Sequence, residues 1–159
     1  MIIRFFLLSL FLVFIAGCET QNDHTFSLSS MVEKKKPIGV IDIRCDKHII
    51  NANEEAKTSK QKKINEFESI IADIKLKRVK SSNISELSKE YAKDKLFTIA
   101  IINAENRKNA LFIDITSDGK GLVVSFKNGE STDKMYEIQN GNPDLYEKVN
   151  DFLSRFIKR

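Results

Sequence analysis

The sequence predicts an α+β domain, in which an antiparallel β-meander carries two packed helices and follows an apolar N-terminus and a flexible tether. Three observations lead to this class. Residues 96–138 contain four apolar or alternating stretches, separated by short polar turns. Residues 59–77 and the stretch after residue 142 each carry apolar side chains at helical spacing. Hydrophobic residues make up 42% and charged residues 30% of the 159 residues, a balance typical of a folded domain.

The N-terminus has the three parts of a signal peptide. Arg4 and the amino group give residues 1–4 a positive charge, and residues 5–16 are apolar except for Ser9. Small residues, Ala16 and Gly17, then precede Cys18. A membrane-spanning helix needs ~20 apolar residues, so residues 1–17 are predicted to be a cleaved signal and not a permanent anchor.

The stretch Ile15-Ala16-Gly17-Cys18 resembles the lipobox of bacterial prolipoproteins. This resemblance implies that a diacylglycerol group is attached to the Cys18 thiol and that the chain is cut after Gly17. The mature chain would then be held at the extracytoplasmic face of the cell membrane, because two or more acyl chains make a stable anchor. The alternative is a secreted protein in which the cysteine is incidental.

Residues 18–36 are polar and are predicted to form a flexible, lipidated tether. The tether contains His24, expected to be exposed, and ends in Lys34-Lys35-Lys36. The lysines are interpreted as a solvated boundary. The other reading is a contact with anionic lipid headgroups, which each lysine near the surface would favour by about 1 kcal/mol.

Residues 37–159 are predicted to form one extracytoplasmic α+β domain. Its first half should contain a strand at residues 38–45, a turn at 46–48, a short strand at 49–52 and a helix at about 59–77. Residues 79–94 leave two alternatives open, a loop or a short helix over residues 86–91. No internal repeat is present.

The second half is predicted to be the meander and a closing helix. The strands fall at residues 96–103, 110–116, 122–126 and 132–138, the first of them apolar on both faces and therefore central. Asp118-Gly119 and Asn128-Gly129 are pairs that primed hairpin turns prefer. Asn142 is a good N-cap and Pro143 suits the first helical position. The helix stripe consists of Leu145, Val149, Phe152, Leu153 and Phe156.

The sequence has few candidates for chemistry. His24 and His48 are its two histidines, and neither stands in a catalytic or metal-binding motif. Asp114 and Asp118 flank a hairpin, where acids usually serve the turn. Cys45 is interpreted as a small apolar residue inside a strand. The alternative is that its thiol is reactive and has a functional role. We therefore expect no enzyme activity, no cofactor and no metal site.

Two function classes remain. One is a binding or accessory module that contacts an envelope protein or a small ligand, with Phe97, Phe112 and Tyr136 as contact aromatics unless they belong to the core. Nucleic acid is not an expected partner, because the net charge of +4 is spread along the chain. In size and anchor the chain also resembles the immunity lipoproteins of bacteriocin producers, the alternative function. Its layout is similar to that of small lipoproteins from low-GC Gram-positive bacteria, a resemblance that implies no activity.

Overall fold

The computed structural model describes residues 25–45 and 55–157. Within them, eight strands form one antiparallel sheet, in the order β1-β4-β8-β7-β6-β5-β2-β3. The strands are β1 (Phe26–Ser27), β2 (Ile38–Cys45), β3 (Glu55–Thr58), β4 (Lys75–Arg78), β5 (Lys95–Asn103), β6 (Asn109–Thr116), β7 (Gly121–Lys127) and β8 (Glu130–Ile138). The α+β class and the predicted meander, β5 to β8, are confirmed.

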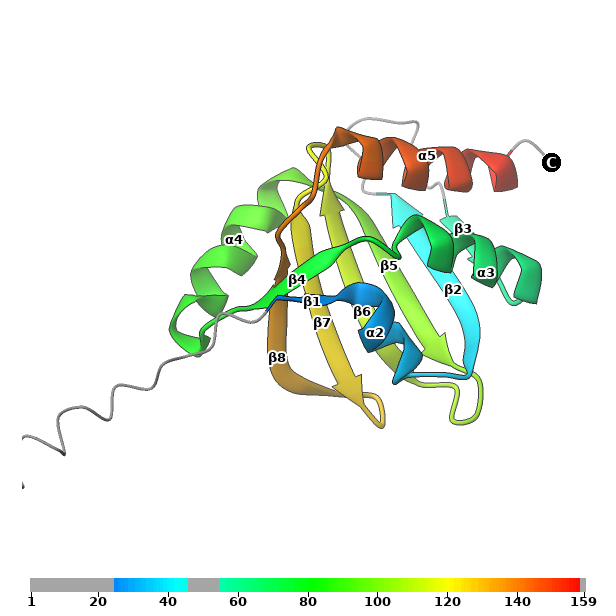
Figure 1. The fold of residues 1–159 in the computed structure, drawn as a ribbon, viewed down its shortest axis with the longest axis horizontal. Coiled ribbons are helices and arrows are strands. Elements are labelled where there is room, and N and C mark those ends of the chain that lie inside the picture. Colours follow the sequence, from blue (N-terminus) through cyan, green and yellow to red (C-terminus); the bar gives the residue numbers. More distant parts are fainter. Residues whose placement is uncertain (1–24, 46–54, 158–159) are drawn as a thin grey trace, which may run out of the picture.

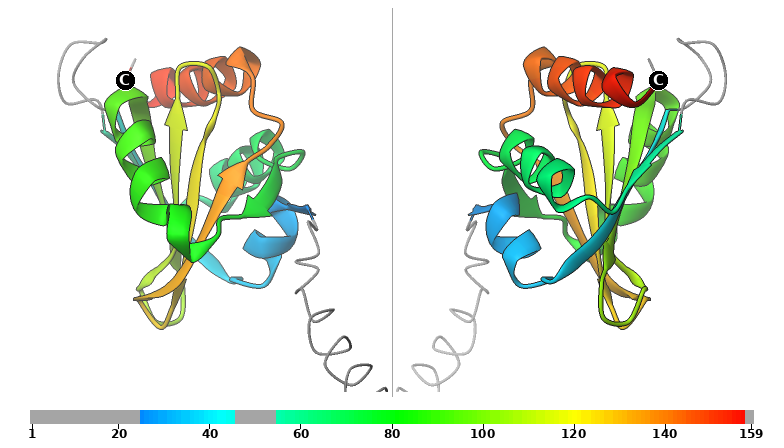
Figure 2. Two further views of the ribbon diagram at one scale, coloured as in Figure 1. Left: turned by 90° about the vertical axis from the view of Figure 1, so that its left-hand side faces the viewer. Right: turned by 90° about the vertical axis from the view of Figure 1, so that its right-hand side faces the viewer.

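Helices cover both faces of the sheet. They are α2 (Leu28–Glu33), α3 (Gln61–Ile70), α4 (Ile84–Asp94) and α5 (Pro143–Ile157), with a 3-10 turn at Ser81–Asn83. Figure 1 shows α2 and α3 in front of the sheet and α5 across its upper end. Figure 2 shows α4 on the opposite face, so the molecule has three layers. In the described part of the chain, no helix is long and apolar enough to cross a membrane.

The core lies between the sheet and the layer of α2, α3 and α5. Alternate residues of the central strands point into it, because successive side chains of a strand leave opposite faces. The aromatic rings of Phe67 on α3 and Phe152 on α5 meet at 5.5 Å between centroids. The largest fully buried side chains are Phe67, Phe97, Phe152, Leu28, Ile41, Ile43, Ile64, Ile71, Leu76, Ile99, Ile101 and Leu111.

The predicted closing helix is confirmed. It begins at Pro143, and the N–H of Leu145 donates to the Asn142 side chain at 3.3 Å, as expected of an N-cap. Four of the five stripe residues are buried and Phe156 packs against them.

The tether prediction needs correction where the chain is described. Residues 26–33 form β1 and α2, and Leu28, Met31 and Val32 on α2 are buried in the core. Three apolar side chains at helical spacing, with Ser27 as an N-cap, are enough for one buried turn when the sheet offers a surface to cover. The folded domain therefore begins near Phe26 and not at Pro37.

The predicted helix at 59–77 is correct only in its first part. α3 ends at Ile70, and residues 75–78 form β4, which pairs with β8 through Leu76 opposite Ile138. The apolar spacing continues past the helix because Ile71 and Ile74 remain buried in the turn that follows. Of the two alternatives for residues 79–94, the helix holds, but it is longer than expected and spans Ile84–Asp94.

The short strand predicted at residues 49–52 lies outside the described residues. The strand that pairs with β2 in the described part of the chain, apart from β5, is β3 at Glu55–Thr58. The two hairpin turns differ from each other. Asn128 and Gly129 both have positive φ, 54° and 85°, as a primed turn requires. In the hairpin between β6 and β7, only Gly119 has a positive φ, so Asp118-Gly119 does not form a primed turn of the same kind. Four residues separate these strands there, and Asp118 stabilises the loop with its side chain.

Candidate functional site

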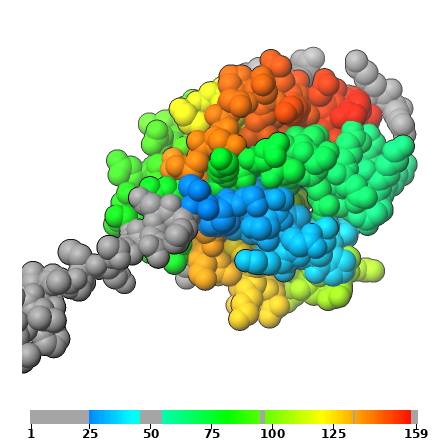
Figure 3. All heavy atoms as spheres, viewed as in Figure 1, coloured from blue at the N-terminus to red at the C-terminus, as the bar shows by residue number. Residues whose placement is uncertain are grey.

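A pocket of about 400 Å3 lies between α2 and the hairpin of β7 and β8. Figure 3 shows α2, in blue, next to this hairpin, in yellow and orange. Four lysines and four hydroxyl groups line the pocket together with two apolar side chains, and none of these described lining residues is acidic. They are Phe26, Ser30, Met31, Lys34, Lys35, Ser125, Lys127, Thr132, Lys134 and Tyr136.

The hairpin of β7 and β8 forms the base of the pocket. The residues on its inner face are apolar near the core and become polar and basic toward the tip. On β7 the inward residues run from Val123, fully buried, to Ser125 and then Lys127. On β8 they run from Ile138 in the core to Tyr136, Lys134 and Thr132. The concave face is therefore apolar where helices cover it and polar and basic toward the hairpin tip.

The opposite wall is α2 with the turn after it, and this wall is held in place at several points. The N–H of Leu28 donates to the Ile74 carbonyl at 2.8 Å. Beyond the helix, the Asn103 amide donates to the Lys35 carbonyl at 2.9 Å, and the Ala104 N–H donates to the Pro37 carbonyl at 2.8 Å. Bonds to the turn before β4, to the end of β5 and to the turn after it thus preform the wall before any ligand arrives.

Lys35 bridges the two walls. Its ammonium donates to the backbone carbonyl of Phe126 on β7 at 2.5 Å, and burial lowers the pKa of this side chain from its ordinary value. Desolvation disfavours the charged form of a lysine, so an anion in the pocket would relieve that cost.

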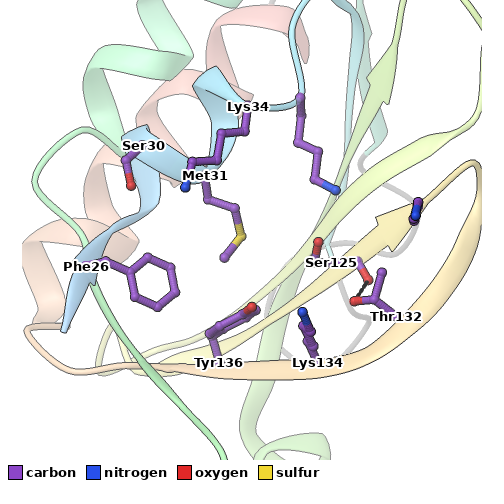
Figure 4. A pocket seen from close by; sticks show the side chains of 10 residues that line it. Phe26, Ser30, Met31, Lys34, Ser125, Thr132, Lys134 and Tyr136 are labelled. Atoms are coloured by element: carbon purple, nitrogen blue, oxygen red, sulfur yellow. Dashed lines mark hydrogen bonds between the residues drawn. The ribbon is translucent and has the colours of Figure 1, made fainter. Parts of the chain in front are cut away.

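Lys34, Lys127 and Lys134 are exposed, and the structure gives none of them an ion-pair partner among the described residues. In Figure 4 the labelled Lys34 and Lys134 come from opposite walls of the pocket, and Ser125 and Thr132 lie side by side on the hairpin. The Thr132 hydroxyl donates to the Ser125 carbonyl at 2.8 Å, which fixes the base of the pocket.

Lys36, the third residue of the lysine run, has a different environment. Its ammonium lies 2.8 Å from Glu33 and 3.7 Å from Glu68, and its hydrogen bond to Glu33, followed by the charge of Glu68, raises its pKa. The run is therefore divided: Lys36 is paired with acids, whereas Lys34 and Lys35 belong to the pocket.

One side of the pocket is apolar. The ring of Phe26 meets that of Tyr136 edge-on, with 5.1 Å between centroids and an interplanar angle of 88°. Met31 extends from α2 toward them in Figure 4. A flexible thioether beside two rings makes a surface that adapts to apolar groups of different shape.

The arrangement suits binding of an anion that carries an apolar portion. Ammonium groups and hydroxyls donate hydrogen bonds to phosphate or carboxylate oxygens, and lysine is a common phosphate-binding residue. The pocket volume falls in the range of small-molecule sites. In the described chain, no group of three His, Cys, Asp or Glu side chains is placed to hold a metal ion.

The lipidation and cleavage residues predicted from the sequence, Cys18 and Gly17, lie outside the described residues, as do His24 and His48. The prediction of a lipid anchor therefore rests on the sequence alone.

The two carboxylates considered as a pair have separate partners. Asp114 accepts from the Thr98 hydroxyl at 2.9 Å. Asp118 accepts from the Thr116 hydroxyl at 2.6 Å and lies 2.9 Å from the Lys120 ammonium. The hydrogen bond from Thr116 is the largest cause that lowers the pKa of Asp118, to about 2. These acids stabilise a strand pair and a loop.

The candidate contact aromatics fall into three environments. Phe97 is fully buried and stacks on Tyr146, whereas Phe112 meets Phe126 on the outer face of the sheet. Tyr136 alone of the three candidates lines the pocket. Cys45 ends β2 and packs partly buried against the core, in the position expected of a small apolar residue.

Sequence reasoning missed the hairpin half of the pocket, formed by Ser125, Lys127, Thr132 and Lys134. One signal was present: Ser125 and Lys127 continue the register of Val123, so polar residues occupy positions that would otherwise be core. The partner wall, α2, could not be assigned because it was interpreted as tether.

Comparisons with protein-family models, with curated proteins and with solved structures gave no match. The site is therefore interpreted from its own geometry and chemistry.

Proposed function

We propose that the chain is a membrane-anchored bacterial lipoprotein, a non-enzymatic extracytoplasmic module that binds an anionic ligand in the pocket between α2 and the β7–β8 hairpin. The anchor is proposed from the lipobox-like stretch that ends in Cys18. The binding role is proposed from one observation, four lysines in a pocket whose described lining includes no acid.

Unneutralised lysines repel one another, and their gathering disfavours the folded state unless an anion joins them. Three lysines outside the pocket, Lys36, Lys63 and Lys120, each lie within 4 Å of a carboxylate. In the pocket, the described lining supplies no carboxylate to the four lysines. A ligand with oxyanions would neutralise the charge of these lysines and remove their mutual repulsion.

A charge-neutral triple variant, Lys34→Gln with Lys127→Gln and Lys134→Gln, tests the pocket. Each exposed lysine is expected to contribute ~0.5–1 kcal/mol, so the three together contribute roughly 1.5–3 kcal/mol. Titration calorimetry with inorganic pyrophosphate should therefore show binding that is weaker by about ten- to a hundredfold. Lys35 is left unchanged because its bond to Phe126 holds the two walls together.

The matched control carries the same loss of charge on three exposed helix positions away from the pocket, Lys62→Gln, Lys89→Gln and Lys148→Gln. It should bind pyrophosphate as the unmodified chain does. Equal weakening in both variants would mean that general charge, and not the pocket, attracts the anion. That outcome would overturn the proposed site.

The anchor has its own test. Cys18→Ala should remove the mass of the acyl groups and release the protein from the membrane fraction, because the proposed anchor is the lipid on that thiol. A variant that stays membrane-bound with unchanged mass after detergent extraction would contradict the anchor and leave the pocket unaffected.

A further inference from the structure

We propose that the ligand is a phospholipid, with its headgroup phosphate on the lysines of the pocket and the start of its acyl region against Phe26, Met31 and Tyr136. This inference rests on the proposed function, since it names the ligand class and the source of the anion. Three features of the described residues carry it: the two-sided chemistry of the pocket, its size, and its position along the chain.

The chemistry of the pocket is divided. Lys34, Lys127 and Lys134 supply charge, whereas Phe26 and Tyr136 supply two aromatic rings whose centroids are 5.1 Å apart. A free phosphate would use the charged part alone and leave the apolar part in water. An amphiphile satisfies both parts, because burying apolar surface and pairing an oxyanion are independent gains.

The size of the pocket also favours more than an inorganic ion. A phosphate needs little more space than a few water molecules, whose share of liquid volume is about 30 Å3 each. The pocket holds about 400 Å3. This leaves room for a glycerol unit and the first methylene groups next to the phosphate.

The position of the pocket along the chain links it to the membrane. Phe26, which lines the pocket, is eight residues from Cys18. Eight residues span at most about 29 Å when fully extended. A lipid on Cys18 would therefore keep the pocket close to the headgroups of the same leaflet, where phospholipids are far more concentrated than free phosphate esters.

The described lining of the pocket includes no carboxylate that could take the place of the ligand. The carbonyls of Val32 and Glu33 at the end of α2 already accept from the N–H groups of Lys35 and Lys36, at 2.8 and 3.3 Å. Glu33, the last residue of α2, is paired with Lys36. Lys34, Lys127 and Lys134 therefore have no ion-pair partner among the described residues and are available to the ligand, whereas Lys35 is bonded to the Phe126 carbonyl.

Vesicle binding tests the inference with the mature chain, residues 18–159, carrying Cys18→Ala so that the covalent anchor does not contribute. Co-sedimentation should be strong with vesicles of equal parts phosphatidylglycerol and phosphatidylcholine and weak with phosphatidylcholine alone. The variant with Lys34→Gln, Lys127→Gln and Lys134→Gln should bind about tenfold less, and the Lys62, Lys89 and Lys148 control within about twofold of the unmodified chain. Equal losses in both variants would overturn the proposal.

A second measurement separates a lipid from a free phosphate and needs no variant. Dihexanoyl phosphatidylglycerol below its micelle concentration should bind about tenfold or more tightly than glycerol phosphate, because it alone reaches the aromatic part of the pocket. Equal affinities would reject the lipid while leaving the anion site in place. Binding of neither compound, together with no binding of pyrophosphate, would reject both the lipid and the proposed function.

Discussion

Asp118 illustrates how one side chain can fix a loop. It accepts hydrogen bonds from the Thr116 hydroxyl and from the N–H of Lys120, and it lies 2.9 Å from the Lys120 ammonium. These donors all favour the ionised carboxylate, with the Thr116 bond first, and they lower its pKa to about 2. The loop that connects β6 and β7 is thus stabilised by a charge.

A depressed pKa makes this contribution dependent on pH. The stabilisation is present above the unfolded pKa of about 4 and is lost as the pH falls toward the folded value of about 2. Asp118→Asn keeps the acceptor oxygen but removes the charge. It should lower the free energy of unfolding at pH 7 by ~1 kcal/mol or less, because the side chain is half-exposed.

Urea unfolding at pH 7 and at pH 2 measures this difference. The gap between Asp118→Asn and the unmodified chain should close at the lower pH. Asp73→Asn, a change at an exposed aspartate in the turn before β4, serves as the reference. A gap of the same size at both pH values would show that the charge of Asp118 has no part in the stability.

At the scale of single residues, the sequence predicts a turn well when the turn depends on residues that readily adopt a positive φ. Asn128 and Gly129 both adopt the left-handed conformation that their pair suggests. At Gly119 the conformation is also left-handed, and an added Cβ would lie 1.9 Å from the Asn142 carbonyl oxygen. That contact joins two loops 23 positions apart and could not be inferred from the Asp118-Gly119 pair.

At the scale of elements, α2 is the main difference between expectation and structure. Its six residues bury Leu28, Met31 and Val32, and they form one wall of the pocket. A helix this short is not stable by itself. The polar composition of residues 18–36 therefore favoured a tether, and only the surface offered by the sheet and by β4 makes the segment fold.

Leu28→Ala tests whether α2 belongs to the core. The side chain is fully buried, so its truncation should lower the free energy of unfolding by ~2–5 kcal/mol. Ser29→Ala, at the exposed neighbouring position, should cost less than about 0.5 kcal/mol. Urea denaturation followed by circular dichroism compares the two. If Leu28→Ala proves as stable as the unmodified chain, the segment behaves as the tether that the composition suggests.

The end of α3 shows why helical periodicity misjudged an element. Ile70, Ile71 and Ile74 continue the apolar spacing of the helix, but the helix ends at Ile70. Residues 75–78 then pair with β8, more than 50 residues later in the chain. Local spacing reports which side chains are buried, and it did so correctly for Ile71 and Ile74. It does not report long-range strand pairing.

At the scale of the whole molecule, the sheet order explains why the meander was predictable and the site was not. Strands β5 to β8 are neighbours both in sequence and in the sheet, so alternation and turns describe them locally. The pocket joins Lys34 and Lys35 to strands about 90 residues further on, where the Lys35 ammonium meets the Phe126 carbonyl. A cluster assembled over that separation leaves no local pattern.

The distribution of charge over the molecule also could not be inferred from the sequence. The chain has a net charge of +4 that is spread along the sequence, and on that basis we expected no nucleic-acid partner. Folding pairs several lysines with carboxylates and leaves four together in one pocket. The proposed anion site therefore rests on the spatial distribution of the charge and not on the size of the net charge.

The most direct test of the anion site is an NMR titration of the Cys18→Ala chain, residues 18–159, with inorganic pyrophosphate. The account predicts amide shifts confined to residues 30–35, 125–127 and 132–136, which come from the two walls of the pocket. It also predicts that these shifts disappear in the Lys34→Gln, Lys127→Gln, Lys134→Gln variant. Shifts centred on another surface, or no shifts at all, would contradict it.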